Sequence, residues 1–149
     1  MKLNILVPIF SVLSLSSAAS YCPSQAANHT AQRQIFYEFV TKFYLNKDAT
    51  SAFTDHVDVD YIQHNPFAKS GRDNAITSLS PLLPTLNFTI LRTNFNNSTG
   101  WVHYRKDQTG TLPTAVVDIL RMNGSCIVEH WDVVQERPAN ATNPLAMWS

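Results

Sequence analysis

After Pro84 the hydrophobic period of this chain changes from about 3.6 residues, typical of a helix, to about 2 residues, typical of a strand. In the first half, the apolar side chains that recur along one helical face are Ile35, Phe36, Phe39, Val40, Phe43 and Tyr44. This spacing predicts a helix from about Ala31 to Asn46, with Thr30 as its N-cap. A shorter helix is expected over Ser51 to His56, and a third begins near Ser70 and is limited by Pro81.

Alternation of apolar and polar residues predicts the strands of the chain. A short strand or extended arm from Val57 to His64 comes first and ends at Asn65-Pro66, where the residue before proline is extended and not helical. Four longer strands follow, separated by turn-forming residues: Asn87 to Asn96, Gly100 to Lys106, Thr114 to Met122 and Cys126 to Gln135.

This order of elements predicts an α+β fold, in which a curved antiparallel sheet is wrapped by N-terminal helices. Helices that lean across a curved sheet leave a cone-shaped apolar pocket, and polar side chains that point into it are candidates for chemistry. The domain is expected to span residues 31–138, followed by an irregular tail over residues 139–149 that is rich in Pro, Asn and Ala.

Composition supports one packed domain and argues against nucleic acid as a partner. The chain has 149 residues, of which 44% are hydrophobic and 15% charged, so it can bury one core. Its 11 Lys and Arg balance 11 Asp and Glu, which leaves no basic excess to hold a phosphate backbone.

The first 19 residues have the pattern of a secretory signal peptide. One positive charge at Lys2 is followed by a mostly apolar stretch, and small residues precede an expected cleavage site after Ala19. The alternative is a buried N-terminal helix. With cleavage, residues 20–30 become the N-terminal segment of a secreted protein that has no membrane association.

Glycosylation and a disulfide bond are also expected for a secreted protein. Six Asn-x-Ser/Thr sequons begin at Asn28, Asn87, Asn96, Asn97, Asn123 and Asn140. An oxidising compartment favours pairing of the two cysteines, Cys22 and Cys126, and the alternative is two unpaired thiols.

The last predicted strand carries the strongest candidate for chemistry. His130 and Asp132 are two residues apart, so their side chains share one face of the strand, about 6–7 Å apart. Strict alternation places Val128 and Val134 on this face and Trp131 on the other, which indicates that the His–Asp face is buried. An imidazole and a carboxylate in a pocket suit a proton donor and a general base. The alternative is a solvent-facing pair on an edge strand.

Other polar residues are weaker candidates. The tract Tyr61-Ile62-Gln63-His64-Asn65-Pro66 alternates, so not all of its polar side chains point one way. The spacing alone favours a strand end whose polar groups cap the neighbouring backbone. His103 lies in the middle of a strand, where a structural role is the alternative. Asp118 and Arg121 fall on opposite faces of their strand unless a bulge intervenes, and they form either a structural ion pair or part of the pocket wall. The histidines lack the close spacing of metal ligands, so no metal is expected.

Three segments together resemble the SnoaL-like polyketide cyclases, within the nuclear transport factor 2-like superfamily. They are residues 61–66 followed by Gly71, residues 116–121 and residues 127–135, and the resemblance extends from about Gln34 to Pro138. The resemblance implies a curved sheet wrapped by helices and an acid/base pocket that works without a cofactor. It implies that Asp132 removes a proton next to a carbonyl group and that His130 assists.

The resemblance also raises His64 to a third catalytic candidate. The residues expected to contact substrate are Tyr61, Gln63, Asn65, His103, Asp118 and Trp131. The partner implied is a small apolar molecule with a carbonyl group, and the outer face of the sheet is a possible homodimer interface.

Two kinds of function follow. The first is a secreted enzyme that catalyses aldol condensation, isomerisation or dehydration of a small carbonyl compound. The alternative is a non-catalytic extracellular binder of a small apolar ligand, or a secreted interaction protein.

Overall fold

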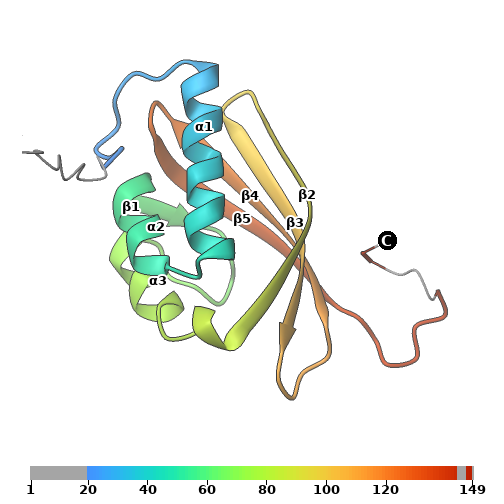
Figure 1. Cartoon of the computed structure of the whole chain (residues 1–149). Coiled ribbons are helices and arrows are strands. Elements are labelled where there is room, and N and C mark those ends of the chain that lie inside the picture. Colours follow the sequence, from blue (N-terminus) through green and yellow to red (C-terminus); the bar gives the residue numbers. More distant parts are fainter. Residues whose placement is uncertain (1–19, 144–146, 149) are drawn as a thin grey trace, which may run out of the picture.

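A computed structural model describes residues 20–143, 147 and 148 of the chain (Figure 1). The expected signal peptide, residues 1–19, lies outside the described residues. The elements in chain order are α1 (His29–Val40), the π-helical turn η1 (Thr41–Leu45), α2 (Ala49–His56), β1 (Val57–Gln63), α3 (Arg72–Leu79), the 3-10 turn η2 (Leu83–Thr85), β2 (Leu86–Asn96), β3 (Thr99–Gln108), β4 (Thr114–Asn123) and β5 (Cys126–Glu136). None of the described helices combines the length and the apolar character needed to cross a membrane.

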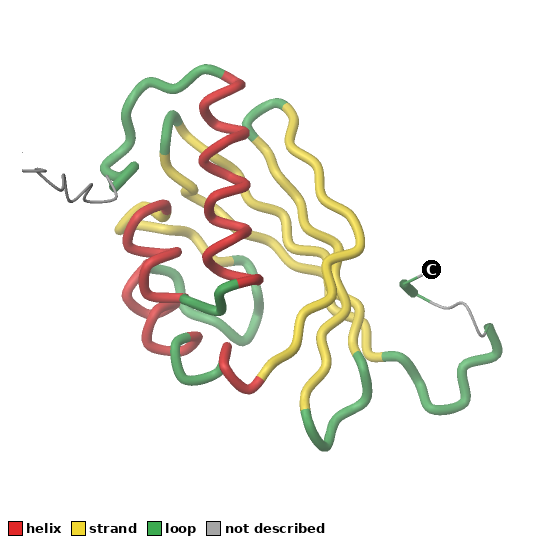
Figure 2. Tube along the Cα trace, viewed as in Figure 1, coloured by secondary structure: helices red, strands yellow, loops and turns green. Residues whose placement is uncertain are grey.

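The five strands form one sheet in the order β1-β5-β4-β3-β2 (Figure 2). Strands β2 to β5 are an antiparallel meander, as the turn residues between them predict. The short strand β1 pairs in parallel with β5, because the chain crosses to the far edge before the meander begins. The α+β prediction is therefore confirmed, with one parallel pair in an otherwise antiparallel sheet.

The helices lie over one face of this curved sheet (Figure 1). The apolar stripe of α1 forms the centre of the core, where Phe36 and Phe39 are almost fully buried. The N-cap of α1 is Asn28, whose side chain accepts a hydrogen bond from the backbone N–H of Ala31, so the prediction of Thr30 is wrong. The following π-turn directs Tyr44 into the core as well.

A β-bulge in β5 changes which residues face the helices. Leu120 of β4 pairs with His130, whereas Met122 pairs with Ile127, so Val128 is an extra residue between them. Beyond the bulge the alternation shifts by one position. Ile127 therefore takes the buried position that strict alternation gives to Val128. The prediction that Val128 shares the buried face with His130 is wrong.

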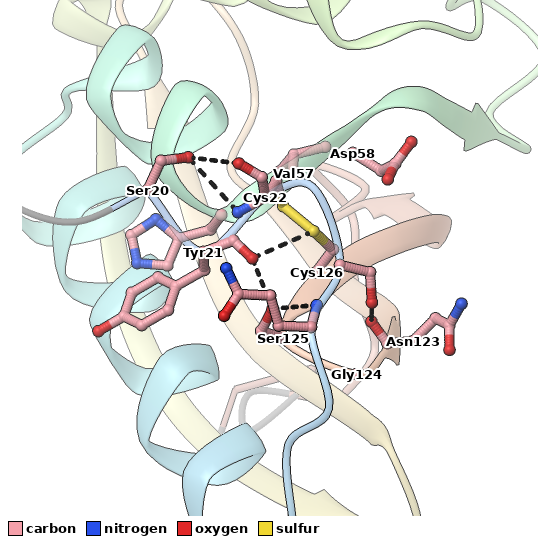
Figure 3. Close-up of a disulfide and its surroundings, with 12 residues drawn as sticks. Ser20, Tyr21, Cys22, Val57, Asp58, Asn123, Gly124, Ser125 and Cys126 are labelled. Carbon is pink, nitrogen blue, oxygen red and sulfur yellow. Dashed lines mark hydrogen bonds between the residues drawn. A yellow bond between two sulfur atoms is a disulfide. The ribbon is translucent and has the colours of Figure 1, made fainter.

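The disulfide bond between Cys22 and Cys126 confirms the predicted pairing (Figure 3). It joins the N-terminal segment to the start of β5. Ser125 reinforces this junction, because its hydroxyl donates to the carbonyl of Tyr21 over 2.5 Å. The backbone N–H of Tyr21 in turn donates to the carbonyl of Asp55 at the end of α2.

All six sequon asparagines are exposed. Glycan attachment to any of them stays a prediction.

Candidate functional site

A cavity of about 240 Å³ lies between the helices and the covered face of the sheet. This volume is slightly below the ~300–1,000 Å³ of typical small-molecule sites. Aromatic and aliphatic side chains form most of the wall. The polar residues at its floor are Tyr61, Gln63, Asn65, Asp118, His130 and Asp132.

The floor is built by the pairing of β4 with β5. Asp118 is directly opposite Asp132, and Leu120 is directly opposite His130. Directly opposite residues of an antiparallel pair point to the same face, so all four side chains reach the cavity. The predicted inward orientation of His130 and Asp132 is thus what the strand register produces.

Asp118 is buried and receives a hydrogen bond from the hydroxyl of Tyr44. Burial, followed by the charge of Asp118, raises the pKa of the Tyr44 hydroxyl well above its usual value. The same two causes raise the pKa of Tyr104, which also hydrogen-bonds Asp118. Both phenols therefore keep their protons and act as donors to the carboxylate.

His130 lies between an amide and a carboxylate. Its Nδ1 is 2.8 Å from Oε1 of Gln63, and its Nε2 is 3.3 Å from Oδ1 of Asp118. The Gln63 oxygen also accepts from the backbone N–H of Asn65, which fixes the orientation of the amide. Since Nδ1 faces an acceptor, it carries a proton, and Nε2 is the nitrogen that faces the carboxylate of Asp118.

Asp132 is held by Asn65, which follows the end of β1. The side-chain amide of Asn65 donates to Oδ2 of Asp132 over 2.5 Å. The other end of that amide accepts from the backbone N–H of Phe67 at 2.8 Å. Asn65 therefore fixes the Asp132 carboxylate and the loop after β1 together.

Tyr61 offers a hydroxyl to the cavity. Its oxygen accepts from the Gln63 amide at 3.2 Å. Burial, followed by the charges of Asp118 and Asp132, raises the pKa of Tyr61 far above its usual value. The hydroxyl hydrogen is therefore retained, and Tyr61 can donate it to an oxygen atom of a bound ligand.

His64 and Trp131 lie on the opposite face of the sheet. Their rings stack with centroids 4.8 Å apart, and His64 Nε2 is 2.8 Å from Glu129. Glu129 also accepts from Arg121, and the hydrogen bonds from His64 and Arg121 lower the pKa of the Glu129 carboxyl. Neither His64 nor Trp131 lines the cavity. Each is next in sequence to a cavity residue, Gln63 or Asp132, and neighbouring residues of an extended chain point to opposite faces.

His103 is also outside the cavity. It alternates with the buried Val102 and Tyr104, and its Nδ1 is 3.3 Å from the Arg92 guanidinium. Its predicted contact with substrate is not supported by this position.

Asp118 and Arg121 lie on opposite faces of β4, as their odd spacing predicts, and Asp118 belongs to the pocket wall.

Three of the cavity residues could offer donor atoms to a metal ion. One atom each from Asp118, His130 and Asp132 lies within 4.8 Å of the others. Typical ligand bonds of ~2.0–2.2 Å would require these side chains to move closer together around an ion.

Sequence reasoning missed Tyr44 and Tyr104. Tyr44 continues the apolar stripe of α1, and Tyr104 alternates with apolar residues in β3, so both match the pattern of ordinary core residues. The available signal was a hydroxyl on an inward position, which requires a polar partner when it is buried.

Comparisons with solved structures identify the fold. TsrD from Streptomyces laurentii is 15% identical, with a TM-score of 0.56 over 72% of this chain and 90% of that one. A nuclear transport factor 2-like protein of unknown function from Burkholderia xenovorans is 19% identical, with a TM-score of 0.61 over 80% and 94%. A Kribbella flavida protein, provisionally described as a ketosteroid isomerase, is 11% identical, with a TM-score of 0.64 over 78% and 87%.

No protein-family model and no curated protein sequence matches the chain. The structural likeness shows that this protein has the nuclear transport factor 2-like fold, which is the fold that the resemblance of the three sequence segments implies.

Proposed function

We propose that this protein is a secreted, cofactor-independent acid/base enzyme that acts on a small apolar carbonyl compound. Asp132 is the general base, which removes a proton from the carbon next to the carbonyl group. The observation that carries this proposal is the convergence of Asp132, His130 and the Tyr61 hydroxyl on one largely apolar cavity.

The three groups have separate roles in this reaction. Asp132 has one oxygen held by Asn65, which leaves the other oxygen to accept the substrate proton. Tyr61 donates its hydroxyl hydrogen to the carbonyl oxygen, where negative charge develops as the proton leaves. Tyr61 takes this role in place of the predicted candidates His64 and His103, because neither of these histidines lines the cavity.

His130 returns the proton or passes it on. Its Nε2 is 3.3 Å from the Asp118 carboxylate, which would stabilise an imidazolium formed beside the base during the reaction. Proton return to a different carbon gives isomerisation, and loss of a hydroxyl from the neighbouring carbon gives dehydration. Attack of the carbanion on a second carbonyl group gives aldol condensation.

A proton-exchange assay tests the general base without knowledge of the natural product. A panel of aryl alkyl ketones is incubated with the protein in D₂O, and NMR measures deuterium entry next to the carbonyl group. We expect exchange in the wild type and a loss of about 100-fold or more in Asp132→Asn.

The matched control is Asp60→Asn, which removes an exposed carboxylate from β1. Exchange should be unchanged in this variant. The proposal is wrong if Asp132→Asn exchanges ketone protons as fast as the wild type while both proteins have the same unfolding midpoint.

Secretion is part of the proposal, and the disulfide bond and the six exposed sequons support it. Mass spectrometry of the mature protein from a eukaryotic host should find Ser20 at its N-terminus. An intact Met1 would contradict it.

We also propose that the protein forms a homodimer through the outer face of the sheet. The half-buried Trp101 and Trp131 lie on this face, opposite the helices. Light scattering on the deglycosylated protein should give twice the monomer mass, and Trp131→Glu should give a monomer.

A further inference from the structure

Two lysines that have no ion-pair partner among the described residues line the cavity. They are Lys106 on β3 and Lys69 in the loop between β1 and α3. No other cationic side chain of the described chain contributes to this wall, apart from His130. The carboxylates of the cavity are instead held by Tyr44, His130 and Asn65.

Lys106 lies at a defined distance from the acid/base groups. It pairs with Thr114 across the sheet, whereas Asp118 pairs with Val102. Four residues of strand separate the two rows, or about 13 Å along the sheet. Between the rows the wall carries the ring of Tyr104, which contacts the ring of Phe88, the residue directly opposite Lys106 on β2. The cavity is thus acidic at one end, aromatic in the middle and basic at the other end.

Lys106 is half-buried beside an aromatic ring, where an ammonium group loses part of its hydration. None of the described residues supplies a carboxylate within ion-pair distance of the Lys106 amine, so its charge is available to an anionic ligand. A bound anion would supply this missing partner.

The loop that carries Lys69 adds an apolar side chain at the same wall. Phe67 lines the cavity although its side chain is 96% exposed. Leu82 lines the cavity too and is 40% exposed. Exposed apolar groups next to a cation fit a ligand that is both apolar and negatively charged.

We propose that the ligand of this cavity is an amphipathic acid: a carbonyl compound with an apolar body and a carboxylate, held by Lys106 and Lys69. The carboxylate lies at the basic end, and the body crosses the aromatic rings. The carbonyl group reaches Tyr61 and Asp132. This inference deepens the proposed function, on which it rests for the placement of the carbonyl end.

The test compares keto acids with their neutral amides. The probes are (4-acetylphenyl)acetate, 3-(4-acetylphenyl)propanoate and 4-(4-acetylphenyl)butanoate, in which a ring separates the ketone from the carboxylate, each with its primary amide. Calorimetry or protein-detected NMR measures the dissociation constant, so the result does not depend on turnover. The variants are Lys106→Met, Lys69→Met and the double variant, and the matched control is Lys47→Met, whose amine contacts only the exposed Asn87.

We expect at least one acid to bind the wild type about ten-fold more tightly than its amide, a difference typical of one charge-assisted contact. The double variant should lose this preference, whereas Lys47→Met should keep it. Added salt should weaken binding of the acid and leave the amide unchanged.

Equal affinity for acid and amide across the series overturns the proposal, as does a preference that survives in the folded double variant. Failure to bind any of the acids also overturns it. The Asp132→Asn variant separates this outcome from the proposed function, because it should keep the preference for the acid while losing proton exchange. Exchange that persists in this variant contradicts the proposed function alone, and a wild type that exchanges ketone protons without preferring the acid contradicts the ligand proposal alone.

Discussion

The imidazole of His130 lies 3.3 Å from the carboxylate of Asp118, measured from Nε2 to Oδ1. The contact places the negative charge of the Asp118 carboxylate next to this ring nitrogen. The geometry depends on Gln63, which faces the other ring nitrogen. A side chain from β1 thereby decides which nitrogen of a histidine on β5 faces Asp118.

Replacement of Gln63 should release the His130 ring. In Gln63→Leu, Nδ1 loses its acceptor, and we expect proton exchange to fall about ten-fold, as for one lost hydrogen bond of about 1–1.5 kcal/mol. The ¹⁵N shifts of His130 should show a mixture of tautomers where the wild type shows a protonated Nδ1. Gln63→Glu keeps an acceptor at this position and should restore that signature. An unchanged tautomer in Gln63→Leu would contradict the role of Gln63.

Loss of a phenol donor should destabilise the buried carboxylate. Tyr44→Phe leaves Asp118 with one donor fewer, and we expect the free energy of unfolding to fall by about 1–3 kcal/mol. Urea denaturation measures this change. The control is Tyr37→Phe, because the Tyr37 hydroxyl only accepts a long bond of 3.4 Å from Thr93. Equal stability of wild type and Tyr44→Phe would show that this hydrogen bond contributes nothing to folding.

Periodicity predicted the elements of this fold well, because each helix and strand has a stripe that must be buried. The predicted strand Thr114 to Met122 differs from β4 by one residue at its end. The bulge at Val128 could not be predicted from the sequence. Ile127 and Val128 are both apolar, so either residue could take the buried position.

Assignment to the site was less successful where it relied on residue type. Gln63 and Asn65 reach the cavity and His64 does not, because neighbouring residues of an extended chain point to opposite sides. For a tract at the end of a strand and before a proline, the sequence alone does not indicate which side chains face the helices and which face away. The pairing of Gln63 with His130 in the sheet decides it.

Stability should fall in mild acid because of His56. This side chain is fully buried, its Nδ1 contacts the carbonyl of Ala52, and its Nε2 has no hydrogen-bond partner. Burial, followed by the charge of Lys42, lowers the pKa of the imidazole below its ordinary 6.5. Between the lowered pKa and 6.5 the unfolded chain binds more protons than the folded protein, so stability is lost as the pH falls through this window.

Urea denaturation at a series of pH values measures this effect. The slope from one such proton approaches about 1.4 kcal/mol per pH unit. His56→Phe should lose its share of the slope, although its stability at neutral pH will also differ from that of the wild type. The exposed His29 is the control, and His29→Phe should keep the slope. An equal slope in wild type and His56→Phe would contradict this assignment.

Reduction of the disulfide bond should destabilise the whole domain. Cys22 and Cys126 are 104 residues apart, and closure of a loop of this length contributes about 4–5 kcal/mol in the chain-entropy model. We expect a reductant to lower the free energy of unfolding by up to this amount, and a double Cys→Ala variant to show the same loss without responding to reductant. Because Cys126 begins β5, four residues before His130, the reduced protein should also exchange ketone protons more slowly at temperatures where it remains folded. A reductant that leaves both the unfolding midpoint and the exchange rate unchanged would show that the junction of the N-terminal segment with β5 holds without its covalent bond.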